Sequence, residues 1–242
     1  MTKPKTRLFM GGVLEAGAEI ALGKGHVHFL GNVLRLKSGD QISLFNGDFG
    51  ECSATVEGLS KRHGVARIGE QTRRPQPEPG PWLAFAPVKK TRTDFIVEKA
   101  TELGVEKLIP VFTKFTATAR VNCERLRAIS IEAAEQCERL SVPEISEPCS
   151  LMDLLADWPS GRKLFVGDEK GRGVRLLQAL SESGTEAQHG FLIGPEGGFA
   201  DDELALVTAR GFCQSVDLGP RILRAETAAI AALSVWNALT KR

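Results

Sequence analysis

The sequence lacks any apolar run of about 20 residues, the length that a membrane-spanning helix needs. The basic stretch at residues 1–7 leads into no apolar core of the kind that a secretory signal contains. We therefore expect a cytoplasmic protein with no membrane partner. Of the 242 residues, 42% are hydrophobic and 25% are charged, as in an average soluble globular protein, so the disordered and fibrous classes are excluded.

Cysteine and histidine are scarce and are not arranged for chemistry. The five cysteines form no CxxC pair, and there are only four histidines. Metal sites and Cys or His nucleophiles need these residues in sets, so we expect no metal and mostly buried, reduced thiols. The phosphate loop GxxxxGK[ST] and the nucleophile elbow GxSxG are absent as well.

Charge is nearly balanced in total, at +1, but not along the chain. Residues 1–75 carry 11 Lys and Arg against 7 Asp and Glu, whereas the remaining 167 residues carry 20 against 23. This asymmetry indicates an N-terminal part that binds a polyanion. A chance excess of solvated surface charge explains the counts equally well.

Proline marks the boundary between two domains. Four of the twelve prolines fall within residues 75–81, where fixed φ angles and missing amide donors prevent both helix and inner strand. We predict a stiff linker over 75–81 between a domain at 1–74 and a domain at 82–242.

The first domain shows short β-like runs separated by turn signals, which predict a small β-barrel. An amphipathic stretch at residues 26–36 interrupts it. The strands are expected at residues 7–10, 40–45, 51–56 and 64–68.

The second domain alternates between strand and helix patterns, which predicts an α/β fold with a parallel sheet flanked by helices. Strands are expected at 82–86, 108–112, 163–166, 191–193 and 215–218. Helices are expected at 93–103, 122–140, from 150 onward, 202–210 and 224–239.

Two loops of this domain are the candidates for ligand binding, because open α/β sheets bind ligands beyond the carboxyl ends of their strands. Residues 193–199 (IGPEGGF) and 218–224 (LGPRILR) each place a Gly-Pro pair directly after a buried strand. Backbone groups and Glu196 there suit a nucleoside or a cation, whereas Glu196 would repel a phosphate. Two ordinary strand-to-helix turns are the alternative, which the pairing of the loops makes less attractive.

Charged residues on the expected helices have a simpler interpretation. Lys99 and Glu102, like the charges at 132–139, fit solvated helix faces with ion pairs. Arg224 and Glu226 differ, since they follow the second Gly-Pro loop directly and must lie near its mouth.

Several long motifs occur in order along the chain. The two strongest are residues 193–199 and residues 218–228 (LGPRILRAETA). Others lie at 33–35, 39–40, 44–47, 99–105, 132–136 and 139–145. Together they resemble the RsmE family, the small-subunit ribosomal RNA uracil-N3 methyltransferases of the SPOUT superfamily.

This resemblance implies an N-terminal PUA-like β-barrel that binds RNA and a C-terminal SPOUT-type α/β domain, tied in a trefoil knot within roughly residues 190–240. It also implies a homodimer, S-adenosyl-L-methionine as cofactor and the small ribosomal subunit as partner. One departure is Ala200 at the start of the helix after the first loop, where we expect Asp201 to act as the cap.

The resemblance also assigns candidate site residues. Arg224 and Glu226 are the candidate catalytic residues. The candidate cofactor-binding residues are Leu192, Ile193, Gly194, Pro195, Glu196, Gly197, Leu218, Gly219, Pro220, Ile222, Leu223, Arg224 and Thr227. The candidate RNA-binding residues are His28, Arg35, Lys37, Arg62, Arg67, Arg73, Lys99 and Arg139.

The implied reaction is methylation of N3 of a uridine in 16S ribosomal RNA within the assembled subunit. N3 lies on the Watson-Crick edge, so the base must be unpaired or extruded. We expect Arg224 to stabilise charge on the uracil carbonyls, and Glu226 either to orient Arg224 or to take up the N3 proton. Two alternatives are a non-catalytic RNA-binding or ribosome assembly factor on the same scaffold, and an α/β enzyme acting on a small nucleotide.

Overall fold

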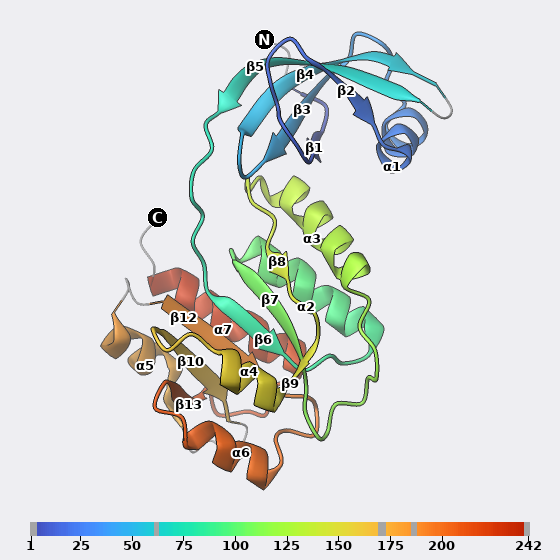
Figure 1. Cartoon of the computed structure of the whole chain (residues 1–242). Coiled ribbons are helices and arrows are strands. Elements are labelled where there is room, and N and C mark those ends of the chain that lie inside the picture. Colours follow the sequence, from blue (N-terminus) through green and yellow to red (C-terminus); the bar gives the residue numbers. More distant parts are fainter. Residues whose placement is uncertain (1–3, 61–62, 169–172, 185–187, 240–242) are drawn as a thin grey trace. The chain divides into compact units, whose positions relative to one another are not determined.

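The computed structural model describes residues 4–60, 63–168, 173–184 and 188–239, and they form two compact units. One consists of residues 1–78 together with 134–142, and the other consists of residues 79–133 and 143–242. The elements are labelled in Figure 1. Among the helices of the described residues, none combines the length and the hydropathy that crossing a membrane requires.

The N-terminal unit is built on a five-stranded sheet with the order β1-β3-β4-β5-β2. β1 pairs in parallel with β3, and the other neighbours are antiparallel. A short helix, α1 (Lys24–His28), and a π-helical turn (Phe29–Val33) cover the region of the expected amphipathic stretch. The strands are β1 (Arg7–Phe9), β2 (Glu19–Leu22), β3 (Gln41–Asn46), β4 (Gly50–Leu59) and β5 (Gly64–Arg73). The four expected strands are confirmed, and β2 was not predicted.

The end of helix α3 (Cys123–Cys137) belongs to the N-terminal unit. Its last turn stops earlier than the predicted residue 140, because Glu138 takes a left-handed conformation with φ 63°. The Glu135 carboxylate accepts the amide N–H of Phe9 at 2.9 Å. The segment is thereby attached to strand β1 and packs on the sheet.

Arg7 caps the C-terminus of this helix. Its guanidinium donates hydrogen bonds to the carbonyl oxygens of Ala134 at 3.0 Å, Glu135 at 3.2 Å and Arg139 at 3.1 Å. It also pairs with Glu51 at 3.1 Å, and both side chains are at most 10% exposed. A cation at a helix C-terminus stabilises carbonyls that have no partner within the helix.

The C-terminal unit holds an eight-stranded sheet in which every pair is parallel, which confirms the predicted α/β fold. Its order is β11-β13-β10-β12-β6-β7-β8, with β9 beside β7. The strands are β6 (Trp82–Phe85), β7 (Lys107–Phe112), β8 (Glu144–Ile145), β9 (Cys149–Ser150), β10 (Arg162–Gly167), β11 (Val174–Arg175), β12 (Gln188–Ile193) and β13 (Cys213–Asp217).

Helices cover both faces of this sheet (Figure 1). Besides α3, they are α2 (Lys90–Glu102), α4 (Leu151–Asp157), α5 (Leu176–Ser183), α6 (Asp201–Thr208) and α7 (Ala225–Leu239). Alternate strand residues face opposite sides, so Leu83 and Phe85 pack with α2, α5 and α7, whereas Ala84 packs with α4 and α6. Of these helices, only α5 was not predicted.

The start of α6 corrects one expectation. Its N-cap is Ala200 rather than Asp201, and the buried Glu203 carboxylate accepts the Ala200 amide at 2.9 Å. The same carboxylate accepts the amide of Lys114 at 2.9 Å. Glu203, the third residue of the helix, therefore satisfies the amide of the N-cap residue and connects the start of α6 to Lys114.

His189 is buried in the N-terminal half of β12. The Trp236 indole donates to Nδ1 at 3.2 Å, and Nε2 lies 2.9 Å from the Ser183 hydroxyl. An indole N–H can only donate, so the proton of the neutral ring sits on Nε2. Burial, followed by the charges of Arg162 and Lys163, lowers the pKa of His189 below its ordinary 6.5.

Replacing Arg7 with alanine should remove the cap of α3 and leave Glu51 with Arg73 as its ion-pair partner. We expect Arg7→Ala to lower the free energy of unfolding by about 3 kcal/mol, measured by chemical denaturation. Lys5→Ala is the matched control, because Lys5 pairs with Asp40 in an exposed bridge that should contribute little. Equal stability of the two variants would contradict the capping role.

His189 should make stability depend on pH. Because its folded-state pKa is lowered, its contribution is present above about pH 6.5 and is lost as the pH falls below that value. We expect His189→Gln to reduce the loss of stability between about pH 7.5 and about pH 5. Exposed His63 provides the control variant, His63→Gln. His26, whose pKa burial also lowers, leaves a residual dependence.

Candidate functional site

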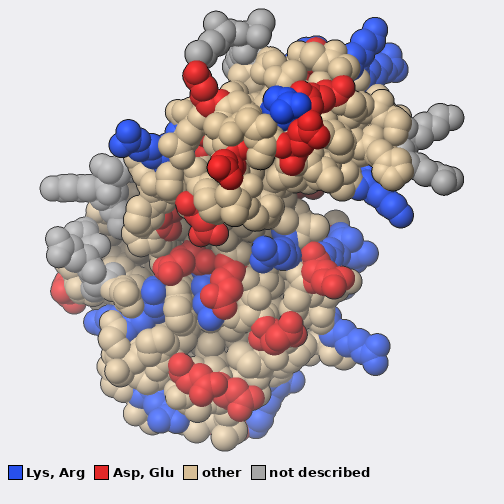
Figure 2. Space-filling model, turned by 45° about the horizontal axis from the view of Figure 1, so that its top comes forward, with Lys and Arg blue, Asp and Glu red and all other residues tan. Residues whose placement is uncertain are grey.

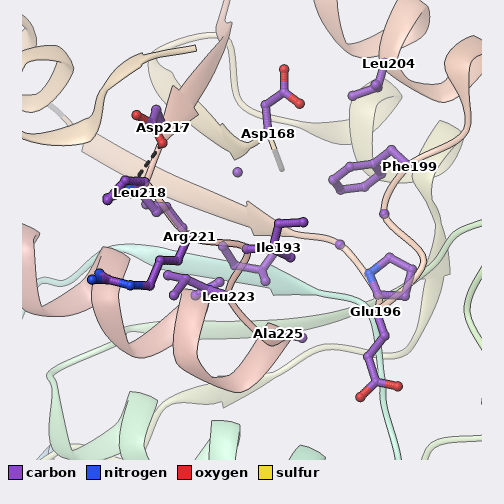
Figure 3. Close-up of a pocket in the computed structure, with 18 residues that line it drawn as sticks. Asp168, Ile193, Glu196, Phe199, Leu204, Asp217, Leu218, Arg221, Leu223 and Ala225 are labelled. Carbon is purple, nitrogen blue, oxygen red and sulfur yellow. Dashed lines mark hydrogen bonds between the residues drawn. The ribbon is translucent and has the colours of Figure 1, made fainter. Parts of the chain in front are cut away.

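A pocket of about 380 Å³ lies at the carboxyl ends of three neighbouring strands, β13, β10 and β12 (Figure 3). Both Gly-Pro loops line it, together with Gly167 and Asp168 from the end of β10 and with Ala225 and Ala228 from α7. Its volume lies in the range of sites for small molecules and cofactors. The two loops therefore share one crevice, as the sequence predicted.

The loop after β12 is shaped by close packing. A Cβ atom on Gly194 would meet the ring of Phe199 at 2.8 Å, which is too close for any side chain there. Gly198, with φ 69°, closes a turn by donating its amide to the Pro195 carbonyl at 2.9 Å. Phe199 and Leu204 add apolar surface to the pocket.

The loop after β13 is held by the last residue of that strand, Asp217. The Asp217 carboxylate accepts the amide of Gly219 at 2.9 Å, the interaction drawn as a dashed line in Figure 3. Gly219 has φ 131°, a backbone conformation that residues with a side chain rarely adopt. Ile222 is 83% exposed, although it lines the pocket.

The charge of the lining residues favours a cation. Asp168, Glu196 and Asp217 are acidic, and Arg221 is the one basic residue among the lining residues that the structure describes. Glu196 differs from the other two, because its side chain points away from the labelled residues around the cavity (Figure 3). Backbone groups, apolar walls and nearby carboxylates would suit a nucleoside that carries a positive charge.

Arg92, in the first turn of α2, explains the direction of Glu196. Its Nη1 forms an ion pair with Glu196 Oε1, and its Nε lies 3.5 Å from Glu226 Oε1. Sequence reasoning missed Arg92. Arg92 lies near the pocket because α2 follows β6, the strand next to β12, and the sequence does not give this strand order.

Comparisons with known proteins agree along nearly the whole chain. A family model described as an RNA methyltransferase domain matches residues 76–237, and one described as an RNA methyltransferase PUA domain matches residues 16–69. The ribosomal RNA small subunit methyltransferase E of Rickettsia conorii is 35% identical over 94% of this chain and 93% of its own. That of Synechocystis is 34% identical, over 92% and 74%.

Solved structures give the same result. A putative methyltransferase of Legionella pneumophila, in complex with the bound cofactor SAM, is 29% identical with a TM-score of 0.88 and covers 99% of both chains. The ribosomal RNA small subunit methyltransferase E of Neisseria gonorrhoeae, bound to S-adenosyl methionine, is 29% identical with a TM-score of 0.87. The match covers 97% of this chain and 98% of that chain.

The chain belongs to the ribosomal RNA small subunit methyltransferase E family. The predicted family is thus confirmed, as is the PUA domain that precedes the α/β domain.

The pocket of this family member overlaps most of the predicted cofactor residues without matching them all. Nine of them line it: Ile193, Gly194, Pro195, Glu196, Leu218, Gly219, Pro220, Ile222 and Leu223. Leu192, Gly197, Arg224 and Thr227 are outside the lining. The pocket is also lined by residues that were not among the candidates: Gly167, Asp168, Gly198, Phe199, Leu204, Asp217, Arg221, Ala225 and Ala228. Of these, Asp168 follows a predicted strand. Which of the lining residues bind the cofactor stays a prediction.

The two candidate catalytic residues lie close in sequence but in different surroundings. The Glu226 side chain is 14% exposed and is paired with Arg92. Arg224 is exposed, and its backbone carbonyl accepts the amide of Ala228 at 2.8 Å. The catalytic roles of both residues stay predictions.

The candidate RNA-binding residues fall into two groups. His28, Arg35 and Lys37 are exposed on the N-terminal unit. The others have protein partners: Arg67 pairs with Glu19 and Glu57, Lys99 with Glu98 and Glu102, Arg73 with Glu51, and Arg139 donates to Ser141 at 2.8 Å. Arg62 lies outside the described residues.

Arg139 is the most deeply buried of these side chains, at 9% exposed, with Nε 3.8 Å from Glu78. Its burial fits a structural role better than contact with RNA. On the face shown in Figure 2, basic and acidic side chains of the described residues are interspersed and form no single large basic area. The assignment of RNA contacts stays a prediction.

Proposed function

We propose that this protein transfers a methyl group from S-adenosyl-L-methionine to N3 of a specific uridine in 16S ribosomal RNA. Family membership supports methylation of small-subunit ribosomal RNA, and relatives solved with the cofactor support its identity. The observation that carries the proposal is the pocket shared by the two Gly-Pro loops. We further propose that the protein is a cytoplasmic homodimer and that the assembled subunit is its substrate.

The residues of the pocket fit the cofactor. Backbone groups of the loops at Gly194 and Gly219 can bind a nucleoside, and apolar side chains such as Ile193 and Leu223 provide walls. The acidic lining residues Asp168 and Asp217 suit its positive charge. When bound, S-adenosyl-L-methionine supplies a methyl group on a positively charged sulfur.

The remaining task falls to residues beside the pocket. Uracil N3 carries a proton at neutral pH, which must leave before or while N3 accepts a methyl group. The Glu226 carboxylate accepts this proton, and the Arg224 guanidinium stabilises the negative charge that spreads onto the uracil carbonyls. Exposed basic residues of the N-terminal unit, such as Arg35 and Lys37, bind RNA phosphates.

Calorimetry with S-adenosyl-L-methionine, followed by methyl transfer assays on free 16S RNA and on small subunits, tests this function. Binding of the cofactor and appearance of 3-methyluridine are expected. Cofactor binding without transfer to any RNA would favour the small-nucleotide enzyme. Binding of RNA without binding of the cofactor would favour the non-catalytic assembly factor.

Gly219→Ala should weaken cofactor binding through the backbone alone. No atom lies within 4 Å of the added Cβ, but the φ of 131° is strained for alanine. A strain of about 1–3 kcal/mol in the bound conformation weakens binding about 5- to 150-fold. Calorimetry measures this, with Gly211→Ala as control, because Gly211 has open space and no positive φ. Unchanged affinity of Gly219→Ala would contradict the role of this loop.

Arg224→Ala should slow the chemical step. With the cofactor saturating, we expect the single-turnover rate to fall about 100-fold, because a charge-stabilising donor is lost. Arg210→Ala, which removes an exposed arginine at the end of α6, should have a normal rate. A rate of Arg224→Ala close to that of the unchanged protein would exclude this role.

A further inference from the structure

Three charged residues meet beside the pocket in the C-terminal unit. Arg92 comes from the first turn of α2, Glu196 from the loop after β12, and Glu226 from the first turn of α7. These segments are far apart in the sequence, and the parallel sheet brings their strand ends together. The cluster therefore connects α2 with two segments that line the pocket, the loop after β12 and the start of α7.

Arg92 contacts the two carboxylates with different nitrogen atoms. Nη1 pairs with Glu196 Oε1, and Nε lies 3.5 Å from Glu226 Oε1. A guanidinium is planar and its N–H groups point in fixed directions, so a single arginine can hold two carboxylates in a defined arrangement. The Arg92 side chain is 29% exposed, so this arrangement is partly shielded from water.

The second oxygen of Glu226 is not used by this pair. Oε2 is buried and has no hydrogen-bond partner among the described residues. A buried carboxylate oxygen without a partner costs free energy, which is a reason to expect a partner from another molecule. Ala225 and Ala228, on the same helix turn, line the pocket. Glu226 therefore belongs to the helix turn that borders the space in which the cofactor would bind.

We propose that Arg92 is a positioning residue for methyl transfer. It keeps the Glu226 carboxylate oriented so that Oε2 accepts the N3 proton of the target uridine, and through Glu196 it joins this carboxylate to the loop at residues 194–198. This inference rests on the proposed function. It goes beyond that function by giving Arg92 the role of orienting the Glu226 carboxylate, the proposed proton acceptor.

A positioning role and a purely structural ion pair predict different losses in a variant without Arg92. If Arg92 only connected α2 to α7, its removal would affect stability and leave turnover unchanged. If it positions Glu226, its removal should lower kcat while KM for RNA and the affinity for the cofactor change little, because a small misplacement of a reacting group costs rate rather than binding.

The experiment measures kcat, KM for the RNA substrate, cofactor affinity by calorimetry and the thermal midpoint. We expect Arg92→Ala to lower kcat about 100-fold, with KM and cofactor affinity within about threefold. Arg92→Lys should recover little, because an ammonium lacks the guanidinium fork. Arg125→Ala is the matched control. Arg125, on α3, forms an ion pair with Asp94 of α2, so this variant also loses an arginine that pairs with α2, and its kcat should be normal.

Combining variants tests the partner directly. The double variant of Arg92→Ala with Glu226→Gln should be no slower than Glu226→Gln alone, because both act on one proton transfer. Multiplied losses, or a kcat of Arg92→Ala within about threefold of normal, would overturn the inference while leaving the proposed function intact. If Arg92→Ala does not fold, Arg92→Gln takes its place in the same cycle. If the protein without substitutions transfers no methyl group to RNA, both the inference and the proposed function are overturned.

Discussion

The parallel alignment of β13, β10 and β12 is the constraint on which the site depends. Since parallel neighbours end at the same edge, the loops after β12 and β13 and the described residues at the end of β10 line one crevice, although they are about 25 residues apart or more in the chain. Glycines allow these loops to pack closely, as at Gly194 against Phe199, or to take a rare conformation, as at Gly219. The pocket is thus a consequence of strand direction and of where side chains are absent.

Charge is distributed according to the same geometry. Acidic residues line a pocket proposed for a cationic cofactor, and Arg92 pairs with Glu196, whose side chain points away from that pocket, and with Glu226. In the N-terminal unit, arginines also bind protein groups: Arg7 caps α3 and Arg139 is buried near Glu78. Several basic residues therefore stabilise the fold, whereas Arg35 and Lys37 are exposed and stay the proposed contacts of RNA.

Local patterns in the sequence predicted most strands and helices, the α/β class and both loops, because periodicity and Gly-Pro pairs are local signals. The strand order was not predictable in this way, since β12 pairs with β6 across more than about 100 residues. Arg92 was missed for that reason. Arg139 was assigned to a solvated face because helix spacing gives no sign that residues 134–142 pack into the N-terminal unit. The trefoil knot rests on the family resemblance.

The most direct test of the account is mass spectrometry of 16S ribosomal RNA from cells with and without the gene. The account predicts that 3-methyluridine is lost from one position without the gene, and that it returns with the unchanged gene but not with Glu226→Gln. Unaltered 3-methyluridine in the deletion strain, or full restoration by Glu226→Gln, would contradict it.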